Sequence, residues 1–211
     1  MEKKKVLFIS QEISPFLPKS EVATTVRNLA QGIQEGGKEI RVFMPRFGVI
    51  NERRHQLHEV IRLSGMNLII DDNDHPLIIK VASISAARMQ VYFIDNDEYF
   101  KRKAIFSDED DQLFSDNDER AIFFAKGVVE TVKKLNWAPD IIHVHGWMAS
   151  LLPLYIKEYY SDEPLFSESK IVTSVYDKDF EGSLNGGLAE KIKFDKISDD
   201  KISILQEPNY T

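Results

Sequence analysis

The stretch KLNWAPDIIHVHGW, residues 134–147, decides the fold of this chain. Lys133 and Lys134 suit the C-terminal end of a helix, where the backbone carbonyls favour cations, and Pro139 prevents the helix from continuing. Residues 141–145 are too apolar for a strand with one face in water, which indicates a parallel strand buried on both faces. The stretch therefore predicts a helix end, a turn and a buried strand that leads into a crevice.

Two histidines lie at the end of this predicted strand. Because side chains alternate along a strand, His143 and His145 are expected on the same face, at the carboxyl end where open α/β sheets hold their ligands. The spacing fits two ligands of a metal ion, but the sequence offers no evident third ligand. The acidic run 107–119 lacks the pattern of a calcium loop and is interpreted as a solvated loop. We therefore expect no metal site.

A βαβ unit is predicted at the start of the chain. Residues 6–9 are typical of a buried strand, and residues 11–19 form the loop that leaves it. Ser20 is expected to cap a helix with one apolar face, which ends at the Gly36-Gly37 pair. Residues 40–43 then form the second strand.

The pattern of apolar residues changes in the next part of the chain. From about residue 50 to residue 88, short apolar runs alternate with turn signals, which predicts a β-rich insertion. Strands are expected near residues 57–63, 67–70 and 77–81. Residues 89–94 are expected to return to the parallel sheet. Together with the βαβ unit, this predicts an α/β fold: a doubly wound, mostly parallel, Rossmann-like sheet with a β-rich insertion.

The clearest helix of the sequence covers residues 117–135. Its apolar side chains recur at spacings of three and four, as a core-facing helix requires, and Asp116 with Glu119 resembles a capping box. A helix over 147–159 and a strand over 170–175 are expected to follow. Residues 188–211 are interpreted as a charged tail of an incomplete fold, and residues 1–211 as one domain.

Composition excludes several classes of protein. Lys and Arg number 27 against 34 Asp and Glu, so the net charge is 27 − 34 = −7, which disfavours nucleic acid as a partner. The chain has no cysteine, which excludes disulfides and fits a reducing compartment. No segment is apolar over the length of a membrane span. We expect an acidic cytoplasmic protein without a membrane partner.

Several blocks of the chain, in the same order, resemble the N-terminal domain of the bacterial glycogen synthases and plant starch synthases, glycosyltransferase family five. The blocks are residues 5–16, 41–48, 91–100, 116–120 and 139–155. The resemblance implies a GT-B fold, in which two Rossmann-like domains face each other. The N-terminal domain carries the glucan acceptor side and a glycine loop, and the C-terminal domain holds the nucleotide of ADP-glucose or UDP-glucose.

Three family motifs are altered in this chain. Where the family has Lys-Thr-Gly-Gly-Leu, this sequence has residues 18–22, PKSEV, so Glu21 puts a carboxylate where a diphosphate would be bound. Lys19 remains one residue away and could still reach such a ligand. The family's His-x-His-Asp-Trp-His becomes residues 143–148, HVHGWM, which lacks an acid and a histidine. Tyr176 stands in the place of the family's active-site histidine. No catalytic residue is therefore intact.

The resemblance and these departures predict an acceptor-side domain that has no glucosyltransferase activity by itself. We expect the crevice near Glu12, His145, Trp147 and Tyr176 to bind α-glucan or a partner protein, without a cofactor. The aromatic side chains could serve as sugar platforms, although core packing is an equally good interpretation of Trp147 and Tyr176. Two alternatives remain: half of an active ADP-glucose:glucan transferase that uses a separate C-terminal donor domain, and a domain for protein interaction only.

Overall fold

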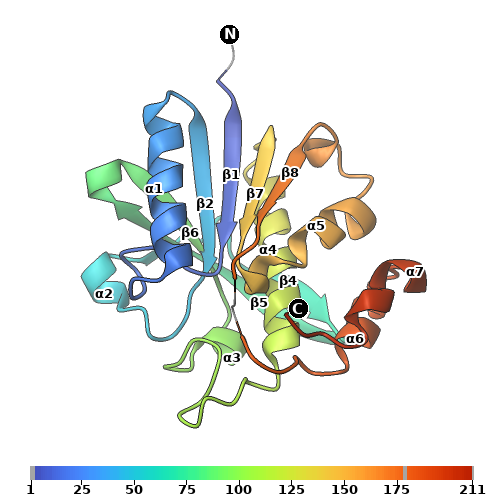
Figure 1. Ribbon diagram of the computed structural model, residues 1–211. Helices are drawn as coiled ribbons and strands as arrows, with labels where there is room; N and C mark the ends of the chain where they lie inside the picture. The colour runs from blue at the N-terminus through green and yellow to red at the C-terminus, as the bar shows by residue number, and fades with distance from the viewer. Residues whose placement is uncertain (1–2, 178–179, 211) are drawn as a thin grey trace.

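The computed structural model describes residues 3–177 and 180–210, and its centre is a mostly parallel sheet (Figure 1). The strands are β1 Lys5–Ser10, β2 Glu39–Pro45, β3 His58–Glu59, β4 Met66–Ile70, β5 Asn73–Ile84, β6 Met89–Asp95, β7 Ile141–His145 and β8 Lys170–Ser174. Their order is β3-β5-β6-β2-β1-β7-β8, with β4 paired to β5. Within this order, the neighbouring strands β6, β2, β1, β7 and β8 are parallel to one another. The predicted Rossmann-like α/β fold is confirmed.

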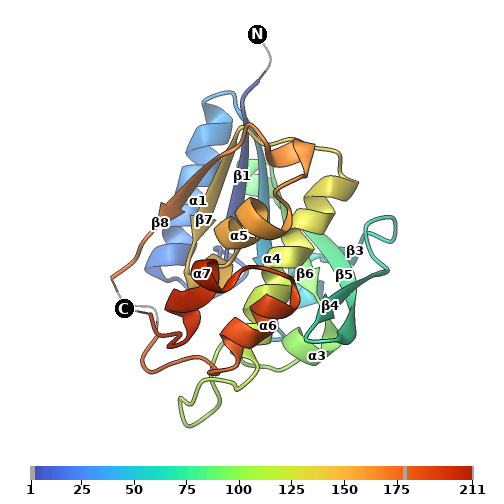
Figure 2. The same ribbon diagram turned by 90° about the vertical axis from the view of Figure 1, so that its right-hand side faces the viewer.

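Helices cover both faces of the sheet. The helices are α1 Glu21–Glu35, α2 Glu52–His55, α3 Asp97–Phe100, α4 Asn117–Lys134, α5 Leu152–Leu154, α6 Leu188–Phe194 and α7 Asp199–Ile202. Helix α1 lies on one face, and α4, α5 and α6 lie on the other, so three layers are seen side by side in Figure 2. None of the helices among the described residues is long and apolar enough to cross a membrane.

The first βαβ unit forms as its sequence predicts. The Ser20 hydroxyl accepts the Ala23 backbone N–H at 2.9 Å and so caps α1. Val22 and Val26 are buried against the sheet. The helix ends at Gly36, and β2 then pairs in parallel with β1. This unit fixes the start of α1 beside the carboxyl end of β1.

The insertion between β2 and β6 is rich in β structure. The long strand β5 pairs antiparallel with three strands, which are β6, β3 and β4. The prediction of a strand over 57–63 is mostly wrong, because only His58–Glu59 pairs with β5. Asp71 and Asp72, both with positive φ, form the turn between β4 and β5. Strand β6 returns to the parallel sheet beside β2, as predicted.

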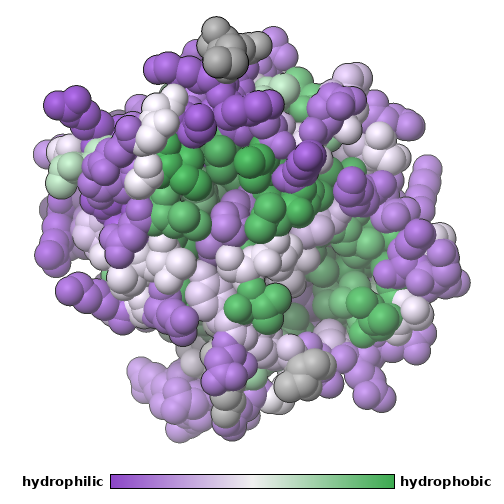
Figure 3. All heavy atoms as spheres, turned by 45° about the horizontal axis from the view of Figure 1, so that its top comes forward, coloured by the Kyte–Doolittle hydropathy of each residue, from purple (hydrophilic) through white to green (hydrophobic). Residues whose placement is uncertain are grey.

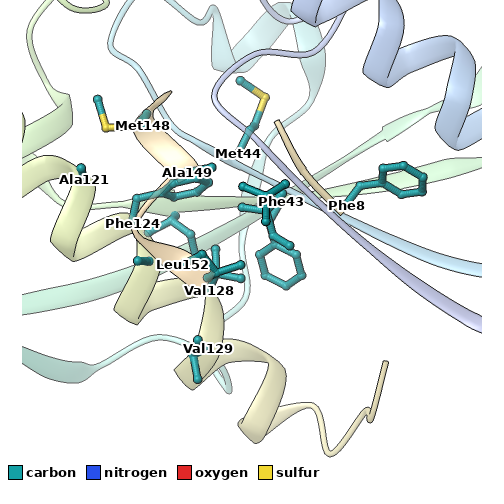
Figure 4. Packing of buried hydrophobic residues seen from close by; sticks show 14 of the residues in the cluster. Phe8, Phe43, Met44, Ala121, Phe124, Val128, Val129, Met148, Ala149 and Leu152 are labelled. Carbon is teal, nitrogen blue, oxygen red and sulfur yellow. The ribbon is translucent and has the colours of Figure 1, made fainter. Parts of the chain in front are cut away.

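The core lies between the sheet and α4. Phe124 and Val128 of α4 lie beside Leu152 and close to Phe43 of β2 (Figure 4). These side chains are fully buried, and so are Ile142 and Val144, which face this layer from β7. The predicted capping box is wrong, because Asp116 occupies the N-cap position without a capping bond. Its carboxylate instead accepts a hydrogen bond from Arg102 at 2.6 Å.

The segment after β7 is less regular than its sequence predicts. A single helix over 147–159 is wrong: the chain forms a 3₁₀ turn at Trp147–Ala149, the short helix α5, and a π-helical turn at Tyr155–Tyr159. Pro153 lies in the first turn of α5, where a missing backbone N–H is tolerated. The broken start of this segment presents Trp147 at the carboxyl end of the sheet.

Strand β8 is the exposed edge of the sheet. It pairs only with β7 in the described part of the chain, and Val172 and Val175 expose 46% and 85% of their surfaces. The space-filling view, tilted toward the amino ends of the strands, shows hydrophobic patches among hydrophilic residues (Figure 3). In contrast, β7 is mostly buried because β1 and β8 flank it.

The charged tail, residues 188–210, is folded onto α4. Leu188 and Ile192 of α6 are buried. The Asp195 carboxylate pairs with the buried Lys126 ammonium at 2.6 Å and accepts a hydrogen bond from the Tyr155 hydroxyl at 2.7 Å. The Lys126 ammonium also donates to the backbone carbonyl of Ile69 at 2.7 Å. One buried cation therefore joins the tail, α4 and β4.

We expect Lys126→Met to destabilise the protein by about 3 kcal/mol or more, because it leaves the Asp195 carboxylate buried without its cation. Urea unfolding followed by circular dichroism measures the change. Lys193→Met is the matched control, since Lys193 pairs with Asp199 at an exposed position, and its free energy of unfolding should stay nearly unchanged. Equal stability of the two variants would contradict a structural role for Lys126.

Candidate crevice at the carboxyl end of the sheet

His145 ends β7 and is fully buried. Its Nδ1 lies 2.8 Å from the Tyr176 hydroxyl, and its Nε2 has no hydrogen-bond partner among the described residues. Burial, with a smaller contribution from nearby His143, lowers the pKa of His145 to about 3. The imidazole is therefore neutral at pH 7 and can offer one hydrogen bond but no positive charge.

His143 lies on the same face of β7, as predicted. The two imidazole centroids are 4.1 Å apart, and His143 Nε2 lies 2.9 Å from the Ser174 hydroxyl. Burial lowers the pKa of His143 as well. Within residues 3–177 and 180–210, no three His, Asp or Glu side chains gather as metal ligands would. Both histidines are thus packed and hydrogen-bonded in the sheet.

Trp147 follows directly and is almost completely buried. Its ring packs between Phe106 and Phe180, with centroid distances of 4.9 and 5.1 Å. The indole Nε1–H has no hydrogen-bond partner among the described residues, although Trp147 exposes only 4% of its surface. A buried N–H without an acceptor costs free energy, so a ligand that accepts its hydrogen bond would be stabilised there.

A pocket of about 300 Å³ lies beside Trp147. One wall comes from Gly146, Trp147 and the end of β8, and the opposite wall comes from the segment 180–210. Tyr210 is part of that second wall, and its hydroxyl donates to the backbone carbonyl of Tyr176 at 2.6 Å. The lining is mostly apolar and aromatic with a few polar groups, as in small-molecule sites.

Glu12 lies in the loop between β1 and α1. Its carboxylate accepts hydrogen bonds from the Ser20 hydroxyl and from the Gln11 amide. Lys19 is exposed at the neighbouring position, outside this hydrogen-bond network, and Glu21 occupies the first turn of α1. The start of the helix is therefore capped by the chain's own serine and carries a carboxylate.

The structure brings His145 and Tyr176 together, and Gln11 connects Glu12 to the loop that carries Trp147. Trp147 lines the pocket, whereas Glu12, His145 and Tyr176 are not among its lining residues. Lys19 is not drawn into this group. Sequence reasoning missed Gln11, Phe180 and Tyr210, because a buried polar side chain and the path of the tail leave no local pattern. Two residues of the segment aligned with the family's histidine motif, Lys178 and Asp179, lie outside the described residues.

The fold and the crevice define a class: an α/β domain of the GT-B glycosyltransferase type. The sequence model of the starch synthase catalytic domain matches residues 5–210. The chain is 38% identical over 195 residues to the glycogen synthase of Chlorobium limicola and 39% identical over 197 residues to that of Chlorobium luteolum. Each match covers 92% of this chain. The chain belongs to the starch synthase catalytic domain family.

The structure has a similar solved relative. The catalytic domain of starch synthase IV from Arabidopsis thaliana, bound to ADP and acarbose, superposes with a TM-score of 0.76 at 17% identity. The match covers 90% of this chain and 37% of the plant chain, and it supports the fold alone. The chain spans about 40% of the length of the two Chlorobium enzymes.

The buried, neutral His145 predicts that acid destabilises the fold. Its pKa of about 3 lies below the usual value of 6.5, so the unfolded chain binds the extra proton between these pH values. Stability from this group is complete above pH 6.5 and falls as the pH drops toward 3. Between pH 6 and 4.5 the wild type should lose about 2 kcal/mol more than His145→Gln in urea unfolding.

His58→Gln at the exposed strand β3 serves as the control for this substitution. It should follow the pH profile of the wild type. Parallel profiles for the wild type and His145→Gln would show that His145 does not remain neutral in the folded state.

Gly146 has a backbone conformation that suits only glycine, with φ 79° and ψ 159°. A Cβ there would also lie 2.4 Å from the Gln11 side chain. We expect Gly146→Ala to destabilise the protein by about 2 kcal/mol or more. Gly186→Ala, with nothing within 4 Å of the added Cβ, should cause no loss in the same denaturation experiment. Similar stability of both variants would contradict this account.

Proposed function

We propose that this chain is an acceptor-side domain that binds α-glucan in the pocket beside Trp147 and transfers no glucose by itself. The observation that carries the proposal is a mostly apolar pocket lined by Trp147, whose buried indole N–H has no acceptor among the described residues. A glucose ring has apolar C–H faces and hydroxyl oxygens, so it can pack on aromatic rings and accept this hydrogen bond.

The walls of the pocket agree with this ligand class. Phe180, which packs directly on Trp147, and Tyr210 add aromatic rings to the lining, with 5.8 Å between the Phe180 and Tyr210 centroids. The Ser174 and Asn209 side chains add polar groups to the lining. Among the described lining residues, Tyr210 alone has an ionisable side chain, which suits a neutral sugar better than a phosphate.

The lack of transfer activity is proposed from the chemistry of the altered motifs. Ser20 caps helix α1, whose first residue is Glu21. A carboxylate at this place would repel a nucleotide diphosphate. His145 is neutral, and its ring nitrogen Nδ1 is already hydrogen-bonded to the Tyr176 hydroxyl. Neither Glu21 nor His145 therefore supplies a positive charge that could stabilise a leaving phosphate.

A second candidate function rests on length. The Chlorobium relatives are glycogen synthases of which this chain spans about 40%, and the plant domain was solved with ADP and acarbose in a longer chain. The chain could therefore be the acceptor half of an ADP-glucose:glucan transferase that works with a separate donor domain. Release of ADP from ADP-glucose when such a partner is added would favour this candidate. With no cysteine, we place either form in the cytoplasm.

The chain has two tryptophans, so nuclear magnetic resonance of the indole N–H groups tests glucan binding directly. Maltoheptaose should shift the Trp147 indole signal, because its N–H gains an acceptor. The Trp137 signal should stay in place, since Trp137 already donates to Glu39 at 2.5 Å. Trp147→Phe keeps the aromatic packing but should weaken maltoheptaose binding roughly tenfold, as the loss of one buried hydrogen bond predicts.

ADP-glucose is the control ligand and should shift neither signal. No response of Trp147 to millimolar maltoheptaose would overturn the glucan proposal. Co-purification of a stoichiometric partner protein, with no response to sugar, would then favour the interaction-only alternative.

A further inference from the structure

Gln11 is a buried polar residue that the motifs of the family do not explain. It follows β1 and exposes only 1% of its surface. Its Oε1 accepts the backbone N–H of Met148 at 3.1 Å, and its Nε2 donates to the Glu12 carboxylate at 3.2 Å. Because one partner only donates and the other only accepts, both bonds fix the same orientation of the amide.

The place of Gln11 depends on Gly146. The Cβ of any other residue at 146 would lie 2.4 to 2.6 Å from the Gln11 side-chain atoms Cδ, Oε1 and Cγ. In the family motif this position holds an aspartate. An acid at 146 would therefore require the Gln11 side chain to leave its observed position, which the glycine at 146 makes room for.

A continuous chain of hydrogen bonds follows from this position of Gln11. Met148 N–H donates to Gln11, the Gln11 amide donates to Glu12, and the Ser20 hydroxyl donates to the other Glu12 oxygen. Ser20 in turn accepts the Ala23 N–H at the start of α1. The loop that carries Trp147 is thus tied to the helix start, and the tie runs through the half-buried carboxylate of Glu12.

Glu12 keeps acceptor capacity in this arrangement. A carboxylate offers about four lone-pair sites, and the described contacts use one on each oxygen. Glu12 is not among the residues that line the pocket beside Trp147, so in this account its remaining sites accept O–H groups from a part of the glucan that extends beyond the pocket. Charge-assisted hydrogen bonds of this kind are about twice as strong as neutral ones, provided that the carboxylate is held in one place.

We infer that Gln11 is a positioning residue for glucan binding, which holds the Glu12 carboxylate and the Trp147 loop in one arrangement and takes the place of the family's acid. The inference rests on the proposed function. Gln11 does not contact the sugar in this account. It sets where the acceptor oxygens of Glu12 lie relative to the indole donor of Trp147.

Maltoheptaose titration by calorimetry at pH 7 tests this role with Gln11→Met, which keeps the size of the side chain but forms neither hydrogen bond. Gln34→Met is the matched control, because the Gln34 amide donates one hydrogen bond to the Arg88 carbonyl on the far side of α1. We expect Gln11→Met to raise the Kd for maltoheptaose at least tenfold and Gln34→Met to leave it unchanged. Equal Kd values for both variants would overturn the inference.

Gln11→Glu separates positioning from mere structural support. A glutamate at 11 still accepts the Met148 N–H but sets a second carboxylate against Glu12. At pH 7 this variant should bind maltoheptaose at least tenfold more weakly than the wild type. Binding should recover toward pH 5, where the two carboxyl groups share a proton and the repulsion ends. The wild type should show no such gain.

If Gln11→Glu bound maltoheptaose at pH 7 with the Kd of the wild type, only the hydrogen bond between residue 11 and the Met148 N–H would matter. The proposed positioning of Glu12 by Gln11 would then be wrong. Failure of the wild type itself to bind maltoheptaose would instead remove the proposed function, and this inference with it. The two failures are therefore distinguishable in one set of titrations.

Discussion

The parallel pairing of β1 with β7 is the constraint on which the crevice depends. The register places Ser10 opposite His145, so both strands end at the same level and their loops leave the sheet side by side. The backbone N–H of Gln11 then reaches the His145 carbonyl at 3.4 Å, and the Gln11 amide reaches Met148. A shift of one residue in this register would turn His143 and His145 to the opposite face.

The tail, residues 188–210, supplies what a single Rossmann-like layer lacks, which is a second wall for the pocket. Two sets of ion pairs away from the pocket attach the tail to α4. One is the buried Lys126–Asp195 pair, and the other is Lys191, which pairs with Asp118 and Glu119 at 2.7 and 2.6 Å. Near the pocket, the Tyr210 hydroxyl donates to the Tyr176 carbonyl, the Tyr210 ring packs on Phe180, and the Pro208 carbonyl accepts the backbone N–H of Leu184 at 2.8 Å and the Ser183 hydroxyl at 3.1 Å. The tail is thus held by ion pairs on α4 and by hydrogen bonds and aromatic contacts beside the pocket.

Two of the three altered motifs replace charged or titratable groups with neutral ones, whereas the third adds the Glu21 carboxylate. Gly146 leaves room for the Gln11 amide, and His145 is buried in its neutral form beside Tyr176, the residue that the sequence aligns with the family's histidine. Neutral donors and acceptors recognise hydroxyl groups, whereas a diphosphate needs cations or free backbone N–H groups. These neutral groups agree with the proposed binding of a neutral sugar.

The sequence by itself determined the class of fold, the βαβ start, the return of β6 and the shared face of His143 and His145. These features follow from periodicity, proline and glycine positions and strand alternation, which act locally. The family motifs in it also singled out His145, Trp147, Tyr176 and Glu12.

Only the tertiary structure decided how these residues meet. Asp116 lost its predicted capping role to Arg102, the helix expected after Trp147 broke into short turns, and the charged tail became a wall of the pocket. The role of Gln11 was also set there, because a hydrogen bond between residues 137 positions apart leaves no periodic trace in the chain. Local patterns fix the elements, but contacts between distant segments fix the site.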